Sequence, residues 1–264
     1  MSLFDAAILG IVEGITEFLP ISSTAHLMFT SELLGLYQTT FVKSFEIAIQ
    51  MGAILAVVVL YWRKFLEVDT MARVAVAFVP TAIIGLTLYP IIKSVLIGNI
   101  AVALVALFVG GILLIVFEYW HKQHATKAGP LLNKGPALVS SLTYKEALLV
   151  GLAQAVAVIP GVSRSAATIV GGLALGLNRQ TIVEFSFLLA APTMAAATVL
   201  DLYKNAGEFS QANWGVLSVG FAVSFVVALA SIVWLLRFVR THNFTGFGIY
   251  RIVAALLFAA LLLA

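Results

Sequence analysis

Long apolar runs alternate with short polar loops along this chain. A helix that crosses a bilayer needs about 20 mostly apolar residues. Six runs meet that length: 44–62, 74–92, 96–117, 182–200, 212–236 and 245–264. The pattern predicts an all-α polytopic membrane protein with six transmembrane helices.

Two further apolar segments, 6–36 and 146–177, carry breaks in the middle. The first is broken at Leu19-Pro20 and the second at Pro160-Gly161, and proline disfavours a continuous helix. Each segment therefore reads as two short helical runs joined by a turn. We expect each to form a re-entrant helical hairpin.

The two broken segments carry the same motif. The first copy reads GIVEGITEFLPISSTAH at 10–26, and the second reads GLAQAVAVIPGVSRSAAT at 151–168. At an offset of 141 residues, Glu13 aligns with Gln154 and Ser22 with Ser163. This pattern indicates one membrane domain, 1–264, built from internal repeats at approximately 1–117 and 145–264. A loop at 118–144, which holds His121 and His124, joins them and is expected to be a cytoplasmic tether without chemistry.

The basic residues predict how the repeats cross the membrane. If the loop at 63–73 is cytoplasmic, alternation of the six spans puts ten lysines and arginines inside and three outside, a bias that the positive-inside rule expects. The ten are Arg63, Lys64, Arg73, Lys122, Lys127, Lys134, Lys145, Arg179, Arg237 and Arg240, and the three are Lys43, Lys93 and Lys204. Both termini then lie outside, and the hairpins enter from opposite faces. This is an inverted-topology repeat with a polar chamber near mid-membrane.

Composition supports the membrane assignment and excludes several chemistries. The chain is 62% hydrophobic and only 10% charged, with a mean hydropathy of +1.08. Soluble proteins are roughly 45–50% apolar and about 25% charged. There is no cysteine, which excludes disulfides, thiolate metal sites and a cysteine nucleophile. The net charge of +3 reflects topology and requires no nucleic-acid partner. We expect no cleavable signal, because acidic residues interrupt the first apolar stretch.

Two glutamates precede the first turn. Glu13 and Glu17 are four residues apart, so a helix places both carboxylates on one face. Carboxylates in an apolar segment are costly and suggest function. They could share a proton for acid or base work, or together hold a divalent cation, Mg²⁺ or Ca²⁺. The alternative is a structural role, either pairing with a neighbouring arginine or capping a helix.

Hydroxyls and a histidine follow the break. Ser22, Ser23 and Thr24 open the second short helix, where they can cap it or help its N-terminus to bind an anion. His26 is spaced to reach Ser22 or Ser23 on its own helix face, as a base beside a hydroxyl nucleophile would be. A capping role alone is the alternative, but the upstream glutamates favour catalysis.

The second copy has arginine where the first has serine. Arg164 corresponds to Ser23, and its planar guanidinium suits phosphate oxygens. The hydroxyls of Ser163, Ser165 and Thr168 complete an anion cradle at the start of the next helix. Pairing of Arg164 with Glu13 or Glu17 is compatible with phosphate binding.

Other polar and small residues give weaker signals. Glu46 and Glu184 either line the chamber or lie near the interface, and Gln50 either faces the chamber or bonds between helices. Arg251, near the inner end of the last span, is expected to snorkel to the membrane surface. Gly110-Gly111 and Gly171-Gly172 permit tight helix packing, within one chain or between two copies in a homodimer.

Together these residues predict a site for an anionic lipid at membrane depth. A phosphorylated lipid fits, with His26 or a glutamate activating water or Ser23 and Arg164 stabilising charge on phosphoryl oxygens. The rival function is a transporter or flippase for an anionic lipid or small anion, since inverted repeats are typical of secondary transporters. Such a carrier needs the arginine but no acid and base set.

The two copies of the motif resemble the signatures of bacterial undecaprenyl-diphosphate phosphatases, also called bacitracin-resistance proteins. The resemblance covers essentially the whole chain, including 45–56 and 187–193. It implies a hydrolase of the bacterial plasma (inner) membrane that converts undecaprenyl diphosphate to the monophosphate carrier lipid of cell-wall synthesis, at a site opening outward. By motif match, it assigns Glu13 and Glu17 to an acidic motif and Ser23 and His26 to the catalytic turn. The phosphate-binding motif comprises Ser163, Arg164, Ser165 and Thr168. The chain departs from the pattern at Ala25 and Ala166, where glycine is expected.

Overall fold

The computed structural model describes residues 1–37, 39–88, 98–128, 139–204 and 214–263, and within these ranges the regular structure is helical. The first half contains α1 (Leu3–Thr16), α2 (Ser23–Leu33), α3 (Thr40–Phe65), α4 (Val68–Thr87) and α6 (Ile100–Ala128). The second half contains the short 3₁₀ helix η3 (Val139–Ser141), α7 (Tyr144–Ala155), the 3₁₀ helix η4 (Val156–Val158), α8 (Arg164–Ala174), α9 (Arg179–Lys204), α10 (Trp214–Phe238) and α11 (Thr245–Leu263).

Six of these helices are long and apolar enough to cross a bilayer, which confirms the predicted number of spans. They cover Thr40–Phe65, Val68–Thr87, Ile100–Gln123, Arg179–Asp201, Trp214–Phe238 and Thr245–Leu262. The chain is therefore a multi-pass membrane protein. Parts of the predicted spans, 89–92, 96–97, 212–213 and 264, lie outside the described residues.

The predicted loop at 118–144 is partly helical. Helix α6 continues to Ala128, because the polar segment after Phe117 contains no proline or glycine before Gly129 to stop a helix. Residues 129–138 lie outside the described residues. The described start of the connection between the halves, up to Ala128, is thus an extension of α6.

Both broken segments form pairs of short helices, and both pairs start in the same way. Ser2 caps α1 in a capping box with Asp5, and Thr143 caps α7 in a capping box with Glu146. Each box satisfies two backbone N–H groups that a helix start leaves free. The two boxes stand 141 residues apart, the spacing of the duplicated motif.

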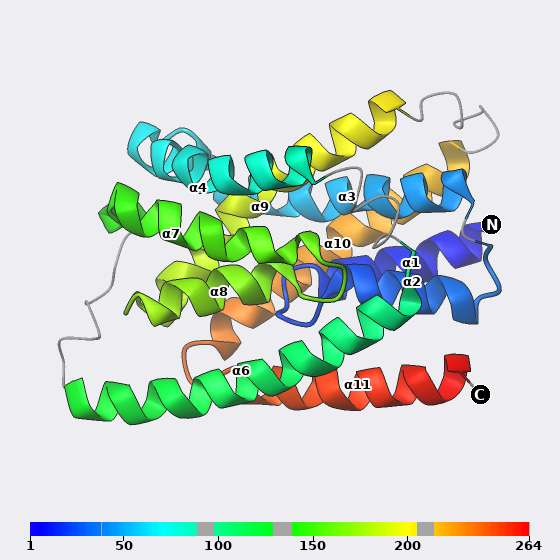
Figure 1. Ribbon diagram of the computed structural model, residues 1–264. Helices are drawn as coiled ribbons and strands as arrows, with labels where there is room; N and C mark the ends of the chain where they lie inside the picture. The colour runs from blue at the N-terminus through cyan, green and yellow to red at the C-terminus, as the bar shows by residue number, and fades with distance from the viewer. Residues whose placement is uncertain (38, 89–97, 129–138, 205–213, 264) are drawn as a thin grey trace.

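The halves interleave. Helix α1 packs against α10, α4 packs against α7, and α6 packs against α11. In Figure 1, α1, α3 and α6 run in the opposite direction to α7, α9 and α11. Both turns, between α1 and α2 and between α7 and α8, lie in the middle of the molecule (Figure 1). The structure holds no membrane, so the re-entrant course of the hairpins and the inverted topology stay predictions.

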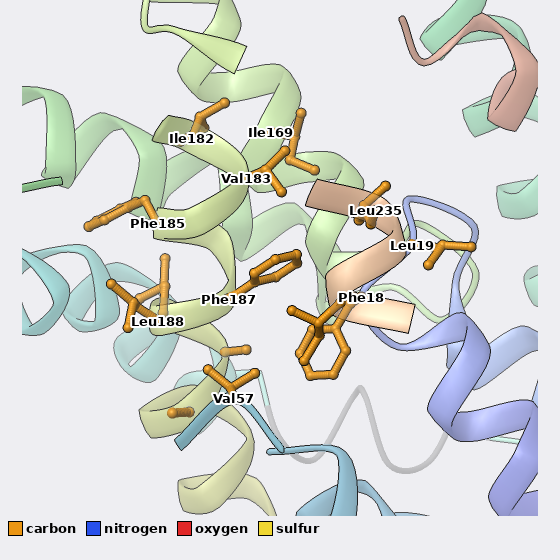
Figure 2. Packing of buried hydrophobic residues seen from close by; sticks show 14 of the residues in the cluster. Phe18, Leu19, Val57, Ile169, Ile182, Val183, Phe185, Phe187, Leu188 and Leu235 are labelled. Atoms are coloured by element: carbon orange, nitrogen blue, oxygen red, sulfur yellow. The ribbon is translucent and has the colours of Figure 1, made fainter. Parts of the chain in front are cut away.

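The main hydrophobic core anchors the first turn. Phe18 is fully buried, and its ring meets that of Phe187 edge to face, with 5.3 Å between centroids. Figure 2 shows Phe18 and Leu19 packed among residues of the second half, including Ile169 and Leu235. Because Phe18 follows Glu17 directly, burial of its ring fixes the backbone that carries this carboxylate.

Candidate active site

The first turn folds the start of α2 back toward the end of α1. Ser22 precedes α2 with φ 70° and ψ 91°, in the left-handed region that residues other than glycine seldom occupy. Beyond this reversal, the Ser23 hydroxyl donates a hydrogen bond to Glu17 Oε2 at 2.5 Å. Both side chains are buried. The strained turn therefore brings a hydroxyl and a carboxylate together.

The second turn has the same backbone. Ser163 precedes α8 with φ 74° and ψ 112°, and its hydroxyl accepts a hydrogen bond from Ala166 N. Among the described residues, Ser22 and Ser163 are the only ones besides glycines with positive φ. They are the aligned serines of the duplicated motif. Arg164 follows as the first residue of α8.

Arg164 crosses between the two turns to Glu17. Its Nη2 lies 2.7 Å from Glu17 Oε1, and its Nη1 donates to the Ser186 carbonyl at 2.8 Å. The carboxylate of Glu17 therefore binds Ser23 through one oxygen and Arg164 through the other. Within the described part of the chain, the buried Nε of Arg164 has no hydrogen-bond partner. This N–H is a buried donor that is left unpaired.

Further bonds join the two turns. The Ser165 hydroxyl donates to the Phe18 carbonyl at 2.8 Å. Thr168 donates to the Arg164 carbonyl at 2.8 Å and lies 3.4 Å from Gln154 Oε1. Ser165 and Thr168 thus hold the turns and the start of α8, and neither lines the cavity described next.

A cavity of about 170 Å³ opens between the turns. Its polar wall comes from Glu17 and Arg164, from two serines and a threonine of the first turn, and from one serine of the second. Its other wall comes from η4, α3 and α9. The lining residues are Glu17, Ser22, Ser23, Thr24, Gln50, Ala157, Ile159, Pro160, Gly161, Ser163, Arg164, Thr193, Met194 and Ala197. One cavity therefore combines charged groups with apolar side chains.

His26 does not face a hydroxyl of its own turn. Its Nδ1 lies 2.8 Å from the Ser22 carbonyl, and its Nε2 lies 2.9 Å from the Tyr250 hydroxyl. Because a carbonyl can only accept, Nδ1 carries a hydrogen, and in a neutral ring Nε2 accepts from Tyr250. His26 is absent from the cavity lining. His26 therefore reaches the Ser22 backbone, but the expected contact with the hydroxyl of Ser22 or Ser23 is wrong, because the other side of the ring faces Tyr250 of α11.

Glu13 lies behind the cavity. Its side chain is fully buried, and neither carboxylate oxygen has a hydrogen-bond partner among the described residues. In that part of the chain, no group of three or more His, Cys, Asp or Glu residues could hold a metal ion. The unpartnered oxygens of Glu13 fit a hard cation, which would need substrate oxygens or water to complete its shell.

The expectation for Arg251 is wrong. It does not snorkel, because its side chain is fully buried and hydrogen-bonds to backbone carbonyls of both turns. Sequence reasoning also missed Tyr250, Thr193 and Met194. The one available signal for Tyr250 was its position directly before Arg251 in the sequence. Thr193 lies in the segment 187–193 that shares the family resemblance, but no role was assigned to it, and Met194 carries no distinguishing pattern within an apolar span.

Of the weaker polar candidates, one lines the cavity and two do not. Gln50 lines the cavity. Glu46 is buried and accepts a hydrogen bond from Ser31 at 2.5 Å, whereas Glu184 lies 3.4 Å from Gln180 on its own helix. Neither glutamate lines the cavity. The two alanines that replace expected glycines, Ala25 and Ala166, are both buried.

Comparison with known proteins gives a consistent result. The model of the family "Bacitracin resistance protein BacA" matches residues 6–257. An undecaprenyl-diphosphatase of Sulfurihydrogenibium sp. (strain YO3AOP1) is 50% identical over 258 residues, 98% of each chain. Proteins of the same name are 48% identical in Aquifex aeolicus, over 100% of both chains, and 51% identical in Wolinella succinogenes, over 98% of this chain and 97% of the relative. With the resemblance of both motifs thus confirmed over the full length, this chain belongs to the BacA bacitracin-resistance family.

Proposed function

We propose that this protein is an undecaprenyl-diphosphatase: a membrane hydrolase that releases inorganic phosphate from undecaprenyl diphosphate and leaves undecaprenyl phosphate, with bacitracin resistance as a consequence. The observation that carries the proposal is the chain of contacts from Ser23 through Glu17 to Arg164 at the wall of the cavity. The names of its full-length relatives support the same activity and do not favour a transporter.

The nucleophile in this proposal is Ser23. Glu17 Oε2 already accepts the Ser23 hydrogen, so it can take this proton as Ser23 Oγ attacks the terminal phosphorus. The bond from that phosphorus to the bridging oxygen breaks, and undecaprenyl phosphate leaves with the proton from Glu17. Water then attacks the phosphorus of phosphoserine and gives a proton to Glu17. The bond from Ser23 Oγ to phosphorus breaks, Glu17 returns the proton to Ser23 Oγ, and inorganic phosphate departs.

Arg164 stabilises the charge of the transferring phosphoryl group. Its Nη atoms are held by Glu17 and Ser186, so the guanidinium is oriented before substrate arrives. In this proposal its unpartnered Nε donates a hydrogen bond to a phosphate oxygen. The first amides of α2 and α8 have no carbonyl partners within their helices. With Ser22, Thr24 and Ser163 at the cavity, they complete the phosphate-binding set.

His26 acts in this scheme by holding the turn. Its Nδ1 hydrogen binds the Ser22 carbonyl, and Tyr250 fixes the other side of the ring. We expect Tyr250→Phe to lower turnover by no more than about 13-fold, since one hydrogen bond is worth about 0.5–1.5 kcal/mol and about 1.36 kcal/mol is tenfold. A loss of a hundredfold or more would instead make His26 and Tyr250 a proton relay and His26 the catalytic base.

A divalent cation is part of the proposal. Glu13 and Glu17 would hold Mg²⁺ or Ca²⁺ together with phosphate oxygens, and the ion would neutralise diphosphate charge. The buried, unpartnered carboxylate of Glu13 supports this assignment. Activity should fall after EDTA treatment and return with Mg²⁺ or Ca²⁺, and Glu13→Gln should raise the cation concentration that is needed. Full activity in EDTA would remove the cation from the scheme.

The orientation in the proposal has both termini and the cavity on the outer side of the inner membrane. The bias of basic residues toward the opposite side supports it, as do Arg63, Lys64 and Arg237 in the last turns of α3 and α10. The chain has no cysteine, so single cysteines can report the topology. A membrane-impermeant maleimide should label Ser2→Cys but not Thr241→Cys in intact cells, and the reverse pattern would invert the orientation.

The decisive test is phosphate release by purified protein in detergent micelles, where no gradient exists. Wild type should release phosphate from undecaprenyl diphosphate, and Glu17→Ala, Ser23→Ala and Arg164→Ala should abolish release while the protein still folds. Matched controls at exposed positions are Glu32→Ala, Ser218→Ala and Arg240→Ala, which should keep wild-type rates. Acid quenching should trap phosphate on Ser23, detectable by mass spectrometry. No release in micelles, with lipid uptake or translocation in proteoliposomes, would favour a carrier.

A further inference from the structure

A second buried arginine lies between the two turns. Arg251 comes from α11, and its side chain is fully buried. A guanidinium has five N–H donors, and five backbone carbonyls accept from this one. Nε bonds Leu107 at 3.3 Å, Nη1 bonds Pro20 at 3.3 Å and Val162 at 3.1 Å, and Nη2 bonds Ala106 at 3.2 Å and Gly161 at 2.9 Å.

The carbonyls that Arg251 binds belong to both turns. Pro20 precedes the strained Ser22, and Gly161 and Val162 precede the strained Ser163. Pro20 and Gly161 stand 141 residues apart, so the guanidinium joins aligned carbonyls of the duplicated motif. The remaining two carbonyls, of Ala106 and Leu107, fix the clamp to α6. A single side chain thus links both turns to one helix.

The partner helix is shaped to receive this side chain. A Cβ atom at Gly110 would lie 2.0 Å from Arg251 Nη2 and 2.8 Å from Cζ. Gly111 lets α11 approach as well, since a Cβ there would lie 2.7 Å from the Gly248 carbonyl. Gly110 stands 141 residues before Arg251. At aligned positions, one half supplies the arginine and the other supplies the space for it.

We propose that Arg251 is a positioning residue, which sets the distance between the turn that carries Ser23 and the turn that carries Arg164. The inference rests on the proposed function of these two turns. Backbone in the left-handed region persists only where surrounding structure holds it, and Arg251 holds both such sites through neighbouring carbonyls. A displacement of reacting groups by about 1 Å can cost on the order of 100-fold in rate.

The test compares Arg251→Met and Arg251→Lys with Arg240→Met, the same change at an exposed arginine. Both kcat and KM for undecaprenyl diphosphate are measured in micelles. We expect kcat/KM to fall about 100-fold in Arg251→Met, with a raised KM, and an intermediate loss in Arg251→Lys, which keeps the charge but offers three donors. A role in folding alone would reduce the active fraction, lowering apparent kcat with KM unchanged.

A second substitution keeps the arginine and removes its space. Gly110→Ala should displace the guanidinium, raise KM and lower kcat/KM at least tenfold. Its matched control is Gly85→Ala, because a Cβ at Gly85 meets nothing within 4 Å. This pair decides the question if Arg251→Met fails to elute as a folded monodisperse species on gel filtration.

Two results would overturn the inference. One is a folded Arg251→Met protein with KM unchanged and kcat/KM within threefold of Arg240→Met. The other is a Gly110→Ala protein that matches Gly85→Ala in both constants. Either result combined with an inactive Arg164→Ala would leave the proposed function intact, whereas an active Arg164→Ala would contradict the proposed function itself.

Discussion

Breaking the ion pair between Arg164 and Glu17 gives the sharpest test of the site. Their side chains are only 12% and 4% exposed, so removing one partner strands a buried charge. Such a loss costs about 3–5 kcal/mol. For a chain of this size, 1 kcal/mol shifts Tm by roughly 2–4 °C. Arg164→Met is therefore expected to lower Tm by roughly 6–20 °C.

A double-mutant cycle separates this pair from general damage to the site. Glu17→Gln alone leaves Arg164 without its anion, whereas the double variant with Arg164→Met strands neither charge. The double loss should therefore be smaller than the sum of the single losses, by about 0.5–3 kcal/mol. Thermal unfolding in micelles can be followed by the emission of the four tryptophans. All three variants should also lack phosphatase activity.

The control is the partly exposed pair of Lys64 and Glu67, at 27% and 41% exposure. Lys64→Met should cost less than about 1 kcal/mol, as exposed ion pairs do. The reasoning would be refuted if the Arg164 and Glu17 losses were additive, or if Arg164→Met were no less stable than Lys64→Met. In either case the two turns would be held by other contacts.

Three further perturbations test the surroundings of the site. Gly151→Ala should destabilise by about 1–3 kcal/mol through overpacking, because a Cβ there would lie 2.1 Å from the Ala77 carbonyl; a Tm equal to that of Gly85→Ala would contradict the close approach of α7 to α4. Arg179→Met should lower Tm, since it strands Glu118, a 3% exposed carboxylate that also accepts from Phe244 N. Its folded fraction should keep wild-type KM, because this cluster does not line the cavity; a changed KM would argue against that separation. Ser22→Gly should leave Tm within about 4 °C, because relief of left-handed strain offsets the added freedom of the unfolded chain, while Ser22→Val should be clearly less stable. Equal Tm values for these two variants would argue against the left-handed backbone at Ser22.

The spans and the broken hairpins were predictable because each depends on local sequence. Apolar length predicts a crossing helix, and Pro20 and Pro160 predict where the short helices stop. The convergence of Glu17 and Arg164 was predictable for a different reason. The duplicated motif made the two turns counterparts, and so the glutamate of one could be paired with the arginine of the other.

The roles of Arg251 and His26 could not be read in the same way. A single arginine near the end of an apolar span reads as a snorkelling residue, and only the tertiary arrangement shows that five carbonyls surround it. His26 and Tyr250 stand 224 residues apart, so helix spacing could suggest only local partners for the histidine. The extension of α6 to Ala128 was not predicted, because a fall in hydropathy marks where a span leaves the membrane and not where the helix ends.

The two copies of the repeat differ for a physical reason at aligned positions whose residues contact each other or share a partner. Gly110 and Arg251 are such a pair, since a side chain at the first would occupy the guanidinium of the second. Ser23 and Arg164 are another, because both bind the carboxylate of Glu17. An arginine in each copy would place two guanidinium groups on one carboxylate, and a serine in each would leave a buried carboxylate without a cation. Two identical residues at these aligned positions could not both bind the Glu17 carboxylate favourably. The difference between Ser23, the nucleophile, and Arg164, the phosphate binder, therefore follows from their shared contact with Glu17.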